Sequence, residues 1–255
     1  MRPTVRPGAA LIAAFAAVSV GAAACTTEPT DSPPPSPFAG TATPVEHTAA
    51  PPVSQPPIAD PALDAQLWQA AADNEAAQVR ELIGRGADLE ARGEHGRTPL
   101  VAATKNRATA AARALIDAGA DVNAADDLAD SAYLYAGAEG LDEILEMTLT
   151  HGADLRSLNR YGGTALIPAC EHGHVETVRR LIEAGVDVNH VNDSGWTAMH
   201  EAIVYGDGSP RYRTVVAALL AAGADPSIRD GAGRTALDNA RRLGQSAIVE
   251  LLNKD

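Results

Sequence analysis

The sequence predicts an all-α fold, a solenoid of about six helix-turn-helix units joined by hairpin tips. Residues 164–189 read TALIPACEHGHVETVRRLIEAGVDVN, with apolar residues at helical spacing on both sides of a Gly-His turn. Two helices of about ten residues each are too short to be stable alone in water, so this hairpin must stack on similar ones. A Gly-x-Asp sequence recurs in steps of 33 residues and marks the other copies: Gly86, Gly119, Gly152 and Gly185.

The central hairpin resembles the ankyrin repeat. The residues that carry the resemblance are Thr164-x-Leu166, His172-Gly173-His174, Leu181-Ile182 and Gly185-Val186-Asp187-Val188-Asn189. The period of 33 residues is also that of the ankyrin family. The resemblance covers residues 61–255 and implies a protein that binds other proteins, is not an enzyme and uses no cofactor or metal. We expect units at about 61–93, 94–126, 127–159, 160–192, 193–230 and 231–255.

The first three units differ mainly at the start of their first helices. Unit one has Ala65-Gln66 where later units have Thr-Pro or Thr-Ala, which is typical of an N-terminal cap. In unit two, Thr98 is expected to cap the helix, with Pro99 at its first position. Unit three places Tyr133 and Tyr135 at core positions, and we expect their hydroxyls to lie near the surface.

The last three units each depart from the pattern once. In unit four, Pro168 removes an early helix hydrogen bond and is expected to bend that helix slightly. In unit five, the next Gly-x-Asp is 38 residues on, at Gly223, and residues 206–212 are expected to lengthen the turn between its two helices. A shortened sixth unit starts at Thr235 and is expected to be the C-terminal cap.

The segment before the repeats predicts export. Basic residues Arg2 and Arg6, an apolar stretch and a small-residue site at 22–24 are typical of a signal peptide spanning 1–24. Ala-Ala-Ala-Cys resembles a bacterial lipobox, although Ala22 stands where Leu is usual, so Cys25 is the candidate lipidation site and the protein a cell-envelope lipoprotein. Ordinary cleavage would instead give a secreted or periplasmic protein. Residues 25–60 are rich in Pro and Thr and read as a disordered linker.

The charge of the repeat region excludes two classes of ligand. Its 18 basic and 29 acidic residues give −11 of the chain's formal −13. Such a surface repels nucleic acid and anionic lipid, so we expect no nucleic-acid partner and membrane contact only through a lipid at Cys25. We expect the protein to be a monomer.

Few residues in the repeats suggest a catalytic or metal-binding role. His172-x-His174 with Glu176 could be a surface zinc site, but His174 occupies the Gly-His turn of the repeat, and the structural role is favoured. Cys170 stands at a small buried position, and His200 is expected to hydrogen-bond within its helix start. The Asp that follows each closing glycine is expected to hold the turn. These aspartates are Asp88, Asp121, Asp154, Asp187 and Asp225.

Function is therefore expected to lie in binding a partner protein on the concave face of the solenoid. The alternatives are a secreted binder of a small ligand or glycan, or an undetected enzyme. Partner contacts are expected at the hairpin tips and the exposed end of each first helix in units four and five. The candidate residues are Arg160, Tyr161, Glu171, His172, Asp193, Ser194, Trp196 and Tyr205. Trp196 could instead only cover the adjacent hairpin.

Overall fold

The computed structural model describes residues 60–253, and within them the chain forms twelve α-helices, one 3-10 turn, η1 (Glu94–Gly96), and no strand. The helical pairs are α1 (Pro61–Ala72) and α2 (Ala76–Gly84), α3 (Pro99–Lys105) and α4 (Thr109–Asp117), α5 (Ala132–Ala138) and α6 (Asp142–Thr150), α7 (Leu166–His172) and α8 (Val175–Ala184), α9 (Ala198–Val204) and α10 (Pro210–Ala221), α11 (Ala236–Arg242) and α12 (Ser246–Leu252). The predicted fold class, an all-α solenoid of helical hairpins, is confirmed. Among these helices, none has the length and apolar character needed to cross a membrane. The predicted signal peptide, Cys25, the linker up to residue 59 and the last two residues lie outside the described part.

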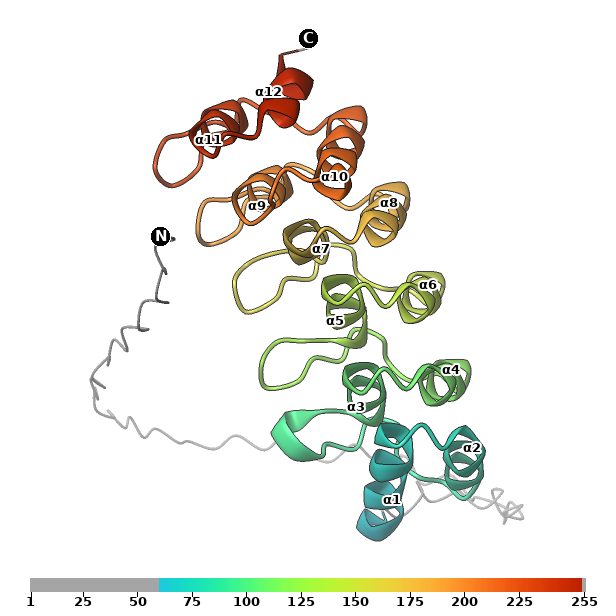
Figure 1. The fold of residues 1–255 in the computed structure, drawn as a ribbon. Helices are drawn as coiled ribbons and strands as arrows, with labels where there is room; N and C mark the ends of the chain where they lie inside the picture. Colours follow the sequence, from blue (N-terminus) through green and yellow to red (C-terminus); the bar gives the residue numbers. More distant parts are fainter. Residues whose placement is uncertain (1–59, 254–255) are drawn as a thin grey trace, which may run out of the picture. The chain divides into compact units, whose positions relative to one another are not determined.

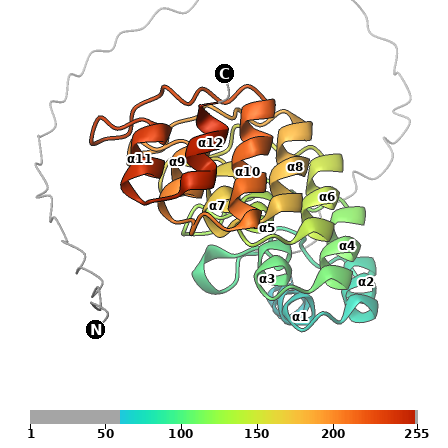
Figure 2. The ribbon, with the colours of Figure 1, turned by 45° about the horizontal axis from the view of Figure 1, so that its top comes forward.

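The hairpins stack in two parallel layers (Figures 1 and 2). Odd-numbered helices contact the next odd-numbered helix and form an inner layer, from which the loops between hairpins project. Even-numbered helices stack on one another in the outer layer. Because each hairpin touches mainly its neighbours, the array is stabilised joint by joint rather than around one central core.

Side-chain caps set where most inner helices begin. Thr98 Oγ1 accepts the Val101 backbone N–H at 3.2 Å, as predicted, and Ser131, Thr197 and Thr235 cap α5, α9 and α11 in the same way. In unit four, α7 begins two residues after Thr164 instead of one. Pro168 explains the shift, because it has no N–H to donate to the Thr164 carbonyl.

The predicted turn role of the aspartates is confirmed. Each accepts the backbone N–H two residues further on at 2.8–3.0 Å. At three of these five positions, the residue two after the aspartate also reaches the following hairpin. Glu90, Asn123 and Asn189 accept the backbone N–H groups of Asp121, Asp154 and Asp225. These bonds fasten successive tips together along the array.

One core expectation was wrong. Tyr133 is fully buried, hydroxyl included, and this oxygen has no hydrogen-bond partner among residues 60–253. Burial raises the pKa of Tyr133 far above its usual range. Tyr135, by contrast, is half-buried, with the Lys105 ammonium 4.8 Å from its ring centre.

The insertion in unit five is also placed differently from the prediction. Compared with unit four, three of the five extra residues lengthen the turn and two lengthen α10, which starts at Pro210. Tyr212 is therefore not in a turn but in the first part of α10, where it is buried. Its hydroxyl donates to the Glu171 carbonyl at 2.9 Å, and its ring packs against Gly206. Gln245 of unit six also donates to the Gly206 carbonyl, at 2.9 Å, so the insertion is tied to both neighbouring units.

Candidate functional site

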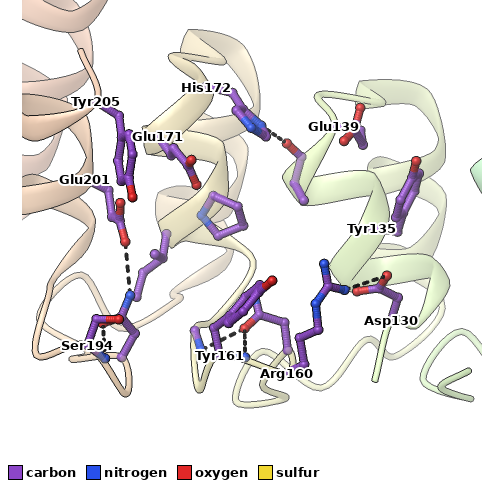
Figure 3. A pocket seen from close by; sticks show the side chains of 16 residues that line it. Asp130, Tyr135, Glu139, Arg160, Tyr161, Glu171, His172, Ser194, Glu201 and Tyr205 are labelled. Carbon is purple, nitrogen blue, oxygen red and sulfur yellow. Dashed lines mark hydrogen bonds and ion pairs between the residues drawn. The ribbon is translucent and has the colours of Figure 1, made fainter. Parts of the chain in front are cut away.

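A groove lies over the inner helices α5, α7 and α9 and the loop tips before them, with a volume of about 460 Å³. We call it the α5–α7–α9 groove. Its lining includes Ile167 and Pro168 of α7. Polar and aromatic side chains from three successive units also line it (Figure 3). It is thus built on the inner layer, where the sequence predicted partner contacts.

The structure brings together most of the predicted contact residues. Six of the eight line the α5–α7–α9 groove: Arg160, Tyr161, Glu171, His172, Ser194 and Tyr205. The other two, Asp193 and Trp196, do not line it. The Asp193 backbone N–H donates to the Tyr161 carbonyl at 3.0 Å, so this residue joins two neighbouring tips.

Trp196 packs against Tyr205, which lines the groove. It is half-buried, and its ring centre lies 5.7 Å from that of Tyr205, with the two planes tilted by 57°. This contact fits the packing role that the sequence left open as an alternative. Tyr205 itself remains exposed on the groove side of this pair.

Arg160 forms one end of the groove. Its Nη1 lies 3.6 Å from Asp130 Oδ2, and its guanidinium lies 4.8 Å from the centre of the Tyr161 ring. The side chain is thus already held by an acidic group and an aromatic face. The exposed Tyr161 ring, which also lines the groove, lies against this guanidinium.

Glu201, which sequence reasoning missed, lies at the other end on α9. Its side chain is buried, with the residue only 6% exposed, and its Oε1 accepts from Asn192 Nδ2 at 3.0 Å. Its Oε2 has no hydrogen-bond partner within the described residues. Burial, followed by the negative charge of Glu171, raises the pKa of Glu201 to about 7, while the Asn192 hydrogen bond opposes the shift.

A signal for Glu201 exists in the sequence. The turn carboxylates recur in each repeat, but the position four residues after the capping Ser or Thr does not recur as an acid. It is Ala102 in unit two, Tyr135 in unit three, Pro168 in unit four and Asn239 in unit six. A carboxylate that breaks the repeat pattern is a better candidate for function than one that follows it.

The histidine pair has a structural geometry. His172 Nδ1 lies 2.8 Å from the Ala138 carbonyl oxygen, and the His172 and His174 rings meet edge to face at 5.5 Å. Burial and the neighbouring His172 lower the pKa of His174. Within residues 60–253, no three His, Cys, Asp or Glu side chains are grouped to hold a metal ion.

Two other candidates lie in the core. Cys170 is fully buried, and burial raises the pKa of its thiol, which disfavours the reactive thiolate. His200 Nδ1 accepts the Thr197 backbone N–H at 3.2 Å in a reciprocal cap, which confirms its expected structural role.

The groove is acidic. Four carboxylates line it, from Asp130, Glu139, Glu171 and Glu201, against the single guanidinium of Arg160. Arg160 is beside Asp130, at the end away from Glu201 (Figure 3). The part of the groove between Glu171, Glu201 and Tyr205 therefore carries the negative charge of Glu171 and, above about pH 7, that of Glu201, and it is bordered by an aromatic ring.

Comparisons with known proteins agree with this architecture. A model described as ankyrin repeats in three copies matches residues 132–230, and an ankyrin repeat model matches residues 95–127. The chain is 54% identical to an ankyrin repeat domain from Acinetobacter baumannii AYE, with a TM-score of 0.72 and coverage of 73% of this chain and 95% of that one. It is 41% identical to the ankyrin repeat protein EF0377, with a TM-score of 0.72 and coverage of 75% and 98%. No curated protein matches the sequence.

Proposed function

Because the chain belongs to the ankyrin-repeat family, whose repeats generally mediate protein–protein interaction, we propose that it is a non-enzymatic scaffold that binds a partner protein in the α5–α7–α9 groove, on its concave face. The observation that carries this proposal is a pair of exposed tyrosines that both line the groove. Tyr161 and Tyr205 are each 59% exposed although they are large and partly apolar. Exposed aromatic side chains around a pocket are typical of binding hot spots.

The two tyrosines are held in place before any partner arrives. The guanidinium of Arg160 lies over the Tyr161 ring, and Trp196 packs against Tyr205. A side chain that is already positioned loses less conformational entropy on binding. This supports a rigid recognition surface rather than one that must be ordered by its partner.

The test is affinity capture from envelope extract with the mature domain, the double variant Tyr161→Ala/Tyr205→Ala and a control. Leu243→Ala removes an exposed apolar side chain at the end of α11, outside the groove. We expect one specific protein whose binding weakens by about 2 kcal/mol or more in the double variant and is unchanged in the control. Circular dichroism should show the same fold in all three. Equal capture by the double variant would contradict the groove assignment, and turnover of a small molecule would contradict the scaffold role.

We further propose that the protein is exported and held at the cell envelope. In this proposal residues 1–24 are removed, Cys25 receives a diacylglycerol and residues 25–60 link the anchor to the repeats. The support is the basic start, the apolar stretch and the Ala-Ala-Ala-Cys sequence. Mature protein should then partition with membranes, and Cys25→Ser should release it, because two acyl chains bind stably. Recovery of the native protein wholly in a secreted or periplasmic fraction would contradict the anchor.

A further inference from the structure

The second carboxylate oxygen of Glu201 distinguishes one end of the groove. Glu201 Oε1 is used by Asn192, whereas Oε2 has no donor among residues 60–253 although it is buried. Figure 3 shows Glu201 on α9 and Glu171 on α7 extending toward the same part of the groove, with Tyr205 beside them. A buried carboxylate without a full set of donors is costly, so its retention here requires an explanation.

The same chain shows a cation in ion pairs with a buried carboxylate and its neighbour. At the joint between units two and three, Lys105 Nζ lies 2.9 Å from the buried Asp126 Oδ2 and 2.7 Å from Asp130 Oδ2. The same ammonium lies 4.8 Å from the centre of the Tyr135 ring. Two carboxylates and a tyrosine thus surround one basic group.

Two joints further along, two carboxylates and a tyrosine again line one part of the groove, although they stand at other positions of the repeat. Glu201 and Glu171 supply the two carboxylates, and Tyr205 supplies the ring. Arg160, the one arginine or lysine among the described residues that line the groove, is already beside Asp130 at 3.6 Å. The two carboxylates also repel each other, as the effect of the Glu171 charge on Glu201 indicates. A cation entering from outside would relieve that repulsion and pair with both.

We propose that the partner inserts one basic side chain, arginine or lysine, between Glu171 and Glu201, with its cationic group against the Tyr205 ring. This inference rests on the proposed function, because the basic side chain belongs to the partner protein proposed there. The other residues of that partner cover the rest of the groove and Tyr161. A guanidinium or ammonium donates to both carboxylates and is attracted to an aromatic face. Exclusion of water by the covering partner strengthens these contacts.

The test uses the full chain and short peptides as probes. Four blocked five-residue peptides share alanine at every position except the centre, which is arginine, lysine, citrulline or glutamate. Citrulline keeps the size and planarity of arginine without its charge. Binding is followed by NMR chemical-shift changes during titration to millimolar peptide. We expect the arginine or lysine peptide to shift resonances of Glu171, Glu201 and Tyr205, and citrulline and glutamate to bind at least about tenfold more weakly.

Matched variants separate this site from general charge attraction. Glu201→Gln should weaken binding of the basic peptide at least about tenfold, whereas Glu183→Gln, an exposed carboxylate on α8, removes the same charge and should change little. Glu171→Gln is the second test, because Glu171 is only half-buried and its change is less demanding on the fold. Equal binding of arginine and citrulline peptides, or equal loss in Glu201→Gln and Glu183→Gln, would overturn the proposal.

The result can be separated from that of the proposed function. A captured partner that is lost by Tyr161→Ala/Tyr205→Ala but kept by both Glu171→Gln and Glu201→Gln would overturn only the inference that a basic side chain inserts between Glu171 and Glu201. Loss of the partner in all three variants, with Glu183→Gln unchanged, would support both.

Discussion

Repeats five and six, each taken from the loop residue that precedes its first helix (Asn192 before α9 and Asp230 before α11), contain the same hydrogen-bonded pair with its two partners exchanged. In repeat six, Asp230 in the loop accepts from Asn239 on α11 at 2.9 Å. In repeat five, Asn192 in the loop donates to Glu201 on α9 at 3.0 Å. Both pairs are nine residues apart and both are buried.

The exchange changes how well the carboxylate is stabilised. The loop position receives two backbone N–H groups in both repeats, from Ala232 and Arg234 to Asp230 and from the corresponding residues to Asn192. These donors, with Asn239 and the Arg234 side chain, outweigh burial and hold the pKa of Asp230 well below its usual range. On the helix, Glu201 receives one amide donor, and burial raises its pKa instead. A carboxylate is therefore better stabilised in the loop, as at Asp230, than on the helix. Repeat five has its carboxylate, Glu201, at the less stabilised position, beside the groove.

The inserted segment is the second difference between the two repeats, and removing its buried side chain should have the largest effect. Tyr212→Ala is expected to lower the free energy of unfolding by about 3–5 kcal/mol, because it leaves a cavity and loses the bond to the Glu171 carbonyl. Urea unfolding measures this change. Asp207→Ala is the control: its side chain is exposed and accepts the Ser209 N–H, so the loss should stay within about 0.5 kcal/mol. Equal losses would mean that the exposed part of the insertion is as important to the fold as Tyr212.

The loop carboxylate of repeat six should come next. Asp230→Ala leaves four donors without their acceptor, and we expect a loss of about 2–4 kcal/mol. Hydrogen exchange should show α11 and α12 opening first, because terminal repeats detach most easily. Asp193→Ala removes the same charge from the exposed tip before α9 and should cost less than about 0.5 kcal/mol. A similar loss in both variants would show that net charge, rather than the loop geometry, decides the effect.

The sequence predicted the elements that repeat and missed those that do not. The Gly-x-Asp period and the capping residues fix the helical hairpins, because each signal recurs at the same place in a unit. Spacing alone does not say whether extra residues join a turn or a helix, so the burial of Tyr212 was missed. The candidate site was found in part: exposed tip residues such as Tyr161 follow from their register. The environment of Glu201 depends on Asn192, Glu171 and Tyr205, which only the stacking of α7 on α9 brings together.

The two carboxylates should also give opposite pH dependences. The folded pKa of Glu201, about 7, lies above its ordinary value near 4.5, so its contribution to stability is fully present below pH 4 and is lost as pH rises through 7. Wild type should therefore lose about 2 kcal/mol relative to Glu201→Gln between pH 5 and 8, measured by urea unfolding at each pH. The depressed pKa of Asp230 acts in the other direction, and its contribution is lost only as pH falls below about 4. Parallel pH curves for wild type and Glu201→Gln would mean that Glu201 is not buried as a titrating acid.

The smallest change in the free energy of unfolding is expected for Tyr133→Phe. This variant tests whether a buried oxygen without a hydrogen-bond partner matters when it lies outside the groove. Like Glu201 Oε2, the Tyr133 hydroxyl lacks a partner in the described part of the chain, but Tyr133 does not line the groove. Its environment includes the turn residue Asp154, whose charge adds to the effect of burial on its pKa. Tyr133→Phe keeps the ring in the core and removes only the hydroxyl, so the free energy of unfolding should stay the same or rise by up to about 1 kcal/mol.

Binding measurements should distinguish the role of Glu201 Oε2 from that of the Tyr133 hydroxyl, which stability measurements do not. If Glu201 matters because it faces the groove, Tyr133→Phe should leave both partner capture and the arginine-peptide titration unchanged, whereas Glu201→Gln weakens both. Destabilisation by more than about 1 kcal/mol in Tyr133→Phe would instead show that the hydroxyl has a partner in solution, such as a buried water. Weakened peptide binding in Tyr133→Phe would mean that recognition depends on the packing of the inner helices as a whole. The charge between Glu171 and Glu201 would then not be sufficient to explain it.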